Sequence, residues 1–184
     1  MTVSERTDDE LVLAAREGDG DAAELLVRRY ARRLSAFLYR LTGSVHDSED
    51  LMQDTFARFF DALADYRPQG QLAAYLFRIA TNLAANARGA ARRKDTALEV
   101  DLASRTPGPE EVATGRQLTA TLREAILKLP PEQREALVLR THQQLDYEEI
   151  AKLQNASVSA VKVRVFRARE ALRPLLSMPE VARA

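Results

Sequence analysis

Two helical patterns separated by a turn stand between residues 145 and 167, where the chain reads LDYEEIAKLQNASVSAVKVRVFR. Asp146 is placed to cap the first helix, and Ser157 is placed to cap the second. Asn155 falls where the chain must turn sharply, and asparagine tolerates a left-handed backbone better than most residues. Ala151 is small enough to let two helices cross closely. The stretch therefore predicts a helix-turn-helix unit.

The second helix of this unit has one apolar side and one polar, basic side. The apolar side is made by Val158, Val161, Val165 and Leu172. The opposite side carries Ser159, Ala160, Lys162, Val163, Phe166, Arg167 and Arg169. Such a helix fits the major groove of DNA, where Lys or Arg can read guanine and Phe166 can contact a thymine methyl group. Arg164 and Arg173 are expected to reach phosphates.

A basic surface helix in an ordinary bundle is the competing interpretation, and the charge of this helix alone favours it. The turn chemistry at Asn155 and the small Ala151 favour the helix-turn-helix instead. Because such units also mediate protein contacts, the motif by itself does not establish DNA binding.

The composition of the whole chain favours helices. Of its 184 residues, 46% are hydrophobic, which is enough to bury real cores. Long runs are rich in the good helix formers Ala, Leu, Arg and Glu, and strand-like alternation is nowhere sustained. We expect an all-α protein with two small helical domains joined by a flexible linker, the second a four-helix domain with the helix-turn-helix.

The expected domains cover residues 9–94 and 117–176. In the first, Asp19 or Asp21 can cap a helix that Gly43 ends, and Ser44 can cap the next. That third helix is expected to end near residue 64, and a fourth to run from about residue 71 towards residue 93. Residues 95–116 are the expected linker, because their RTPGPEE stretch has prolines and no apolar period.

Several classes of protein are disfavoured by what the chain lacks. It has no Cys and only two His, so disulfides, thiolate metal sites and multi-histidine sites are not expected. The stretch MTVSERTDDELVL has no signal-peptide core, and no apolar run approaches the ~20 residues of a membrane span. No phosphate-binding glycine loop or nucleophile–base pair is visible by spacing. We expect a cytoplasmic, non-enzymatic protein without cofactor, metal or membrane insertion.

Two surfaces of the N-terminal domain are candidates for binding. One is an acidic helix face formed by Asp50, Gln53 and Asp54, although such a face is more often simply solvated. The other combines aromatic, amide and basic side chains, namely Tyr66, Tyr75, Phe77, Asn82, Asn86, Arg88, Arg92, Arg93 and Lys94. Aromatic rings can stack on unpaired bases while cations follow a single-stranded backbone. Spacing alone favours a core position for Phe77.

Four stretches resemble extracytoplasmic-function (group IV) sigma factors, in the family's order and over about residues 9–176. SEDLMQDTF at 48–56 looks like the core-polymerase-binding motif, and AYLFRIATNLA at 74–84 looks like the promoter-melting and minus-ten segment. LPPEQRE at 129–135 and the helix-turn-helix, ending FRAREAL at 166–172, look like the minus-thirty-five domain. The resemblance implies a sigma factor that binds core RNA polymerase and directs promoter-specific initiation.

The resemblance also implies roles for individual residues. Core polymerase would be bound through the clamp helices of its largest subunit by Asp50, Gln53 and Asp54. The minus-ten DNA would be held by Tyr66, Tyr75, Asn82, Asn86, Arg88, Arg92 and Arg93. The minus-thirty-five DNA would be read by Ser159, Lys162, Val163, Arg164, Phe166 and Arg167. The second domain would rest on the flap of the other large subunit, and an anti-sigma factor would be a further partner.

The chain departs from the family pattern at a few places. It has no Trp, although one is common near Tyr75. Ser159–Ala160 stands where Gly-Thr commonly opens the recognition helix, Asn155 where Gly is common, and Val163 where Ser is often found. These departures keep the architecture and leave the promoter sequence and the strength of melting open.

The alternatives belong to other functional classes. A stand-alone helix-turn-helix regulator would bind an operator without polymerase, but such proteins are usually basic, whereas here 27 Lys and Arg balance 27 Asp and Glu. A small helical enzyme lacks visible catalytic groups, and a helical adaptor would have no nucleic-acid role. Zero net charge fits a factor whose DNA affinity comes partly from the polymerase.

Overall fold

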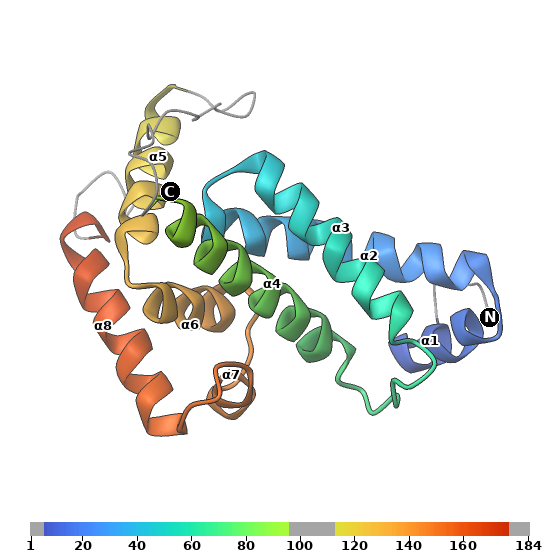
Figure 1. The fold of residues 1–184 in the computed structure, drawn as a ribbon. Coiled ribbons are helices and arrows are strands. Elements are labelled where there is room, and N and C mark those ends of the chain that lie inside the picture. The colour runs from blue at the N-terminus through green and yellow to red at the C-terminus, as the bar shows by residue number, and fades with distance from the viewer. Residues whose placement is uncertain (1–5, 96–112, 177–184) are drawn as a thin grey trace.

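The computed structural model describes residues 6–95 and 113–176, and throughout these ranges the regular structure is helical (Figure 1). The N-terminal part contains α1 (Asp8–Arg16), α2 (Gly20–Thr42), α3 (Val45–Asp61) and α4 (Leu72–Asp95). The C-terminal part contains α5 (Ala113–Lys128), α6 (Pro131–His142), α7 (Tyr147–Leu153) and α8 (Val158–Leu176). The prediction of an all-α protein with a four-helix second part is confirmed.

The N-terminal helices begin and end where local chemistry predicts. Ala22 donates its backbone N–H to the Asp19 carboxylate over 3.1 Å, so Asp19 rather than Asp21 caps α2. Gly43 ends α2 in the left-handed region, with φ of 76°, and a Cβ there would lie 2.6 Å from Leu127 Cδ1. Ser44 caps α3 by accepting from the Asp47 N–H over 3.2 Å. Helix α3 stops at Asp61, slightly before the predicted end.

The core of the N-terminal part forms along one side of α2. The side chains buried there share helical spacing, and they are Leu26, Tyr30, Leu34, Phe37, Leu38 and Leu41. Phe77 of α4 is fully buried, and its ring packs edge-on to that of Phe37 with centroids 5.1 Å apart. The core position that spacing favours for Phe77 is therefore confirmed.

The helices on either side of the expected linker extend into it. Helix α5 begins at Ala113, inside the expected linker of residues 95–116, and α4 extends to Asp95. Residues 96–112, which make up most of that linker, lie outside the described residues. Within the described ranges, no helix is long and apolar enough to cross a bilayer.

The two parts of the chain pack against each other. Helix α6 lies against α2, and α7 lies against α4, so one apolar cluster contains residues from both parts (Figure 1). Polar contacts cross the same junction. Arg134 donates to the carbonyl of Leu41 at the end of α2, and Arg33 donates to Gln143 Oε1 over 3.3 Å. The helix-turn-helix is thus held beside the N-terminal helices in this arrangement.

Candidate nucleic-acid interface

The helix-turn-helix is stabilised by the caps that its sequence predicts. The Asp146 carboxylate accepts from the Glu149 N–H over 2.7 Å, and the Glu149 carboxylate accepts from the Asp146 N–H over 2.8 Å. This reciprocal pair fixes the start of α7. Asn155 has a positive φ of 46° at the turn, and Ser157 Oγ accepts from the Ala160 N–H over 3.2 Å. The turn and the start of α8 are therefore set by local hydrogen bonds.

A polar network that includes the buried Glu135 holds α8 against α6 and the turn. Arg164 donates to Gln154 Oε1 over 2.9 Å and pairs with Glu132 over 2.5 Å, leaving its side chain only 22% exposed. Gln154 in turn donates to Glu135 Oε1 over 3.1 Å. Burial raises the pKa of the Glu135 carboxyl above its ordinary value, and the Gln154 hydrogen bond partly opposes this shift. In this arrangement the Arg164 guanidinium is engaged within the domain.

The remaining predicted residues of α8 form an exposed face. The exposed members are Ser159, Lys162, Val163, Phe166 and Arg167. The opposite side is buried and consists of Val161, Val165, Ala168 and Leu172, while Val158 is half-buried. Lys162 Nζ lies 5.6 Å from the ring centroid of Tyr147, which also has Arg140 over it. Helix α8 lies at the end of the molecule opposite α1 (Figure 1).

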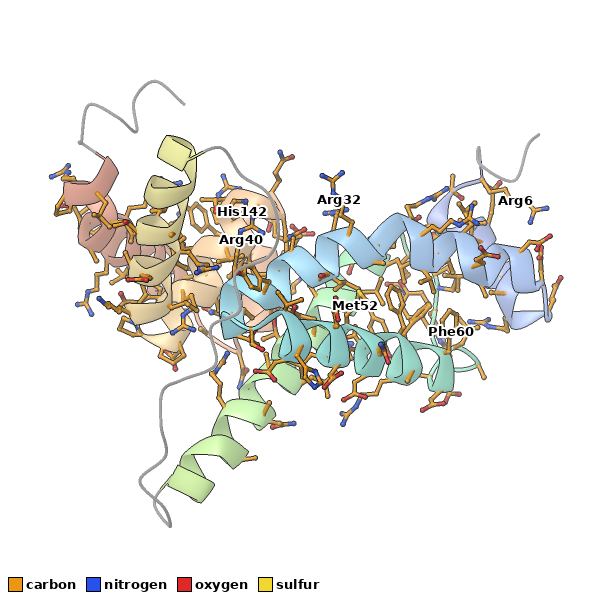
Figure 2. The ribbon with its side chains drawn as sticks, turned by 90° about the horizontal axis from the view of Figure 1, so that it is seen from above. Arg6, Arg32, Arg40, Met52, Phe60 and His142 are labelled. Atoms are coloured by element: carbon orange, nitrogen blue, oxygen red, sulfur yellow. The ribbon has the colours of Figure 1, made fainter. Side chains whose placement is uncertain are left out.

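The predicted acidic face lies on the solvent side of α3. Asp50, Gln53 and Asp54 are all exposed. Met52 and Phe60, on the same helix, are half-buried against the core instead (Figure 2). His46 Nδ1 lies 3.0 Å from Asp50 Oδ2, and a backbone hydrogen bond together with the Asp50 charge raises the pKa of His46. One carboxylate of the face therefore has a titratable neighbour.

The predicted minus-ten residues divide into several groups. Tyr66 and Tyr75 pack together, with ring centroids 4.8 Å apart, and both line one hollow at the surface. Helical spacing places Asn82 and Asn86 on the same side of α4 as Tyr75, and both amides are exposed, although the described lining of the hollow includes neither. Together these residues form a stripe that leads away from the hollow along α4.

Arg88 points towards a different neighbourhood. It is half-buried and lines a second hollow together with Asp50 of α3 and Arg134 of α6. Arg92 and Arg93 belong to α4, but their side chains lie outside the described residues. Arg88 therefore lines a different hollow from the one beside Tyr66 and Tyr75.

The loop that carries Tyr66 is fixed by residues that the sequence did not indicate. Asp9 of α1 accepts from the Gly70 N–H over 2.9 Å, and Gly70 has a positive φ of 68°. Arg16 of α1 donates to the carbonyls of Leu63 and Tyr66. Hydrogen bonds with α1 therefore hold both the start and the end of this loop in place.

The hollow beside Tyr66 also involves the C-terminal part. Its lining includes Glu149, Lys152 and Leu153, all from α7. The Arg78 guanidinium stacks 5.0 Å from the Tyr75 ring at the same place. Desolvation by burial raises the pKa of Tyr66, whose hydroxyl is buried without a hydrogen-bond partner among the described residues. The first helix of the helix-turn-helix therefore borders the aromatic pair.

Comparisons with known proteins agree with these features. Residues 26–94 match the family model for Sigma-70 region 2, and residues 119–172 match that for Sigma-70 region 4. The chain is 36% identical to the ECF RNA polymerase sigma factor SigE of Mycolicibacterium smegmatis, over 94% of this chain and 70% of that protein. It is 32% identical to the RNA polymerase sigma-H factor of Pseudomonas aeruginosa, over 95% of this chain and 98% of that one.

Solved structures show the same fold. The sigma factor RpoE in complex with the anti-sigma factor NepR, from Bartonella quintana, aligns with a TM-score of 0.72 at 25% identity, covering 85% of this chain and 97% of that one. CnrH in complex with the cytosolic domain of CnrY aligns with a TM-score of 0.67 at 28% identity, covering 92% and 96%. The chain therefore belongs to the extracytoplasmic-function family of RNA polymerase sigma factors, which direct the polymerase to promoters.

Proposed function

We propose that this sigma factor binds core polymerase and two promoter elements through three separate surfaces of the described structure. Helix α3 docks on the clamp helices of the largest polymerase subunit, the aromatic hollow with α4 holds the minus-ten DNA, and α8 reads the minus-thirty-five duplex. The second domain also rests on the flap of the other large subunit. The observation that carries the proposal is the exposed face of α8 within a capped helix-turn-helix.

Reading of the upstream element is assigned to the exposed face of α8. Lys162 and Arg167 present cationic donors that suit guanine or phosphate in the major groove. Arg164 was expected to contact DNA, but its ion pair with Glu132 favours a role in holding α8 in place. Its contact with DNA stays a prediction.

Capture of an unpaired minus-ten base is assigned to the hollow beside Tyr66 and Tyr75. Two packed rings offer a stacking surface, and the exposed Asn82 and Asn86 continue from it along α4. Taking a base out of the duplex costs a few kcal/mol of unstacking, which contacts in the hollow and the polymerase must offset. Because α7 borders this hollow, we expect α7 to move away from α4 when the DNA enters.

Docking on the polymerase is assigned to the exposed acidic face of α3. The face keeps Asp50, Gln53 and Asp54 in water while the opposite side of the helix is buried. Reversing one charge, Asp54→Arg, is expected to weaken core binding more than about tenfold, since like-charge contacts at an interface are costly. A pull-down with core polymerase measures this, and unchanged affinity would contradict the docking role.

An anti-sigma factor is proposed as a further partner. The support is that RpoE of Bartonella quintana, one of the structures similar to this chain, was solved with an anti-sigma factor.

A gel-shift comparison separates this function from that of a stand-alone regulator. We expect specific binding of promoter DNA only when core polymerase is present, because the chain has no net charge to support autonomous binding. Leu13→Ala, an exposed change on α1, serves as the control that should behave like the unchanged protein. Tight specific binding by the free protein would overturn the proposal.

A further inference from the structure

One amide side chain joins the three helices that meet at the turn of the helix-turn-helix. Gln154 lies at the end of α7, directly before the left-handed Asn155. Its Nε2 donates to the carbonyl of Glu132 over 2.9 Å and to Glu135 Oε1 over 3.1 Å, and both residues belong to α6. Its Oε1 accepts from Arg164 of α8 over 2.9 Å. Gln154 therefore connects α6, the end of α7 and α8 through a single group.

The partners of Gln154 fix which way its amide points. The Arg164 guanidinium can only donate hydrogen bonds, so it must face the amide oxygen, and the amide nitrogen must then face α6. Glu135 is only 6% exposed, so loss of its donor would leave a polar group that water reaches poorly. The ion pair of Arg164 with Glu132 uses an exposed carboxylate, which contributes less. Gln154 thus carries the link from α8 to the buried carboxyl group of α6.

Apolar contacts alone would fix the rotation of α8 about its own axis less closely. The buried side of α8 is apolar, and attraction between apolar groups has no preferred direction. Hydrogen bonds weaken steeply when they are bent, so the bonds that meet at Gln154 oppose such a rotation. Side chains end about 5–6 Å from a helix axis, so a rotation of about 15° would move the exposed face by roughly 1.5 Å. That shift is large against the range of about 0.5 Å within which hydrogen bonds form.

We propose that Gln154 is a positioning residue for promoter reading, which fixes the rotation at which α8 is presented to the upstream element. Its amide is occupied by α6 and α8, so it acts through α8 and not by contact with DNA. This inference rests on the proposed reading of the upstream element by α8. It adds a residue that determines specificity from the turn, outside the recognition helix itself.

Exchanging the amide and the carboxylate tests the proposal. Gln154→Glu places two carboxylates against each other, and their repulsion should displace α8. In the double variant Gln154→Glu, Glu135→Gln, the amide at position 135 can donate to the new carboxylate, which still accepts from Arg164. The carbonyl of Glu132 loses its donor, but this hydrogen bond is exposed and water can replace it. The double variant should therefore restore the position of α8.

Transcription of a randomised promoter library with core polymerase measures the effect. Each variant is assayed well below its own thermal unfolding midpoint. For Gln154→Glu we expect the preference for the best upstream bases to fall about tenfold, the effect of one buried hydrogen-bonding group left unpaired. The minus-ten preferences should stay the same. The double variant should recover most of the lost upstream preference.

Further variants separate positioning from added charge. Gln154→Leu removes the same hydrogen bonds without a new charge, and it should weaken the upstream preferences as Gln154→Glu does. Gln133→Glu adds the same charge to α6 outside these contacts. Glu135→Gln alone keeps an acceptor for the Gln154 amide. Both of these controls should keep the upstream preferences of the unchanged protein.

The outcomes distinguish this inference from the proposed function. Upstream preferences that stay unchanged in Gln154→Glu and Gln154→Leu would overturn the positioning role, even if total transcription fell, because a merely structural residue would lower the yield alone. Failure of the double variant to recover would overturn it too. If the unchanged protein selected no upstream element, the proposed function itself would be wrong.

Discussion

The exposed face of α8 and the hollow beside Tyr66, the two surfaces proposed to bind DNA, are built in opposite ways. The face of α8 is convex, and its shape depends on caps and contacts within the helix-turn-helix itself. The hollow depends on distant parts of the chain, because α1 pins its loop and α7 borders it. A locally built surface is ready for duplex DNA, whereas a surface shared between two parts of the chain is sensitive to how those parts are arranged.

This difference suggests an order of events on the promoter. In the described arrangement the Phe166 side chain is open to solvent, while Tyr66 is half-buried beside α7. The upstream element can therefore be contacted without rearrangement. We expect capture of a minus-ten base to need movement of α7 away from α4, because α7 borders the hollow.

The largest effect is expected from fixing α7 in place. Ala74 and Lys152 line the same hollow from α4 and α7, and the chain contains no cysteine. With Ala74→Cys and Lys152→Cys joined by a short cleavable bismaleimide, promoter opening by the holoenzyme should be lost and should return after cleavage. Fluorescence of 2-aminopurine in the minus-ten segment measures the opening. Single-cysteine proteins treated alike are the controls, and normal opening by the linked protein would contradict the order of events.

A smaller effect is expected from removing one cation of the α8 face. Arg167→Ala should lower promoter use about tenfold or more, since a base-reading side chain contributes roughly 1–3 kcal/mol of discrimination. The base preferences at the upstream element should change, while those at the minus-ten element should stay the same. Transcription of a promoter library by the variant measures both. Unchanged upstream preferences would show that α8 is not the reading helix.

Tyr66→Phe separates the stability of the hollow from its function. The Tyr66 hydroxyl is buried without a partner in the described structure, so its removal should stabilise the free protein by about 1 kcal/mol. If that hydroxyl contacts the captured base, opening should become weaker at the same time. Thermal unfolding and 2-aminopurine fluorescence test the two effects separately. If Tyr66→Phe were less stable than the unchanged protein, the Tyr66 hydroxyl would have to make a stabilising hydrogen bond, which contradicts the structure.

The smallest effect, on thermal stability, is expected from changing Glu135, which belongs to the polar network that holds α8. Burial raises the pKa of Glu135, so the folded chain binds this proton more tightly than the unfolded chain, and stability falls as the pH rises above the ordinary carboxyl range. Glu135→Gln should raise the unfolding midpoint at neutral pH by about 2–4 °C and reduce that pH dependence. The exposed Glu148→Gln is the control. A lower midpoint for Glu135→Gln would show that the ionised carboxyl stabilises the network.

Features that depend on near neighbours in the chain were predictable from the sequence. The caps at Asp146 and Ser157 and the left-handed Asn155 follow from side chains within a few residues. The burial of Phe77 follows from helical spacing, because one face of α4 must pack on α2. Local hydrogen bonding and periodicity determine such features.

Features that join distant residues were not predictable in the same way. Nothing local indicates that Arg164 pairs with Glu132 or that Asp9 fixes Gly70, because each needs the tertiary arrangement to bring the partners together. The same holds for Arg88, whose place beside Arg134 depends on how the two parts of the chain pack. Charge and spacing predict DNA contacts for Arg164 and Arg88, and the tertiary contacts of these two side chains compete with that role.

The most direct test of the account is transcription by core polymerase and this protein over a randomised promoter library. The account predicts enrichment of two separate elements at a fixed spacing, with Arg167→Ala altering only the upstream one. Linking α7 to α4 should abolish transcription, because it blocks promoter opening. Enrichment of a single element, or transcription that does not depend on the protein, would contradict it.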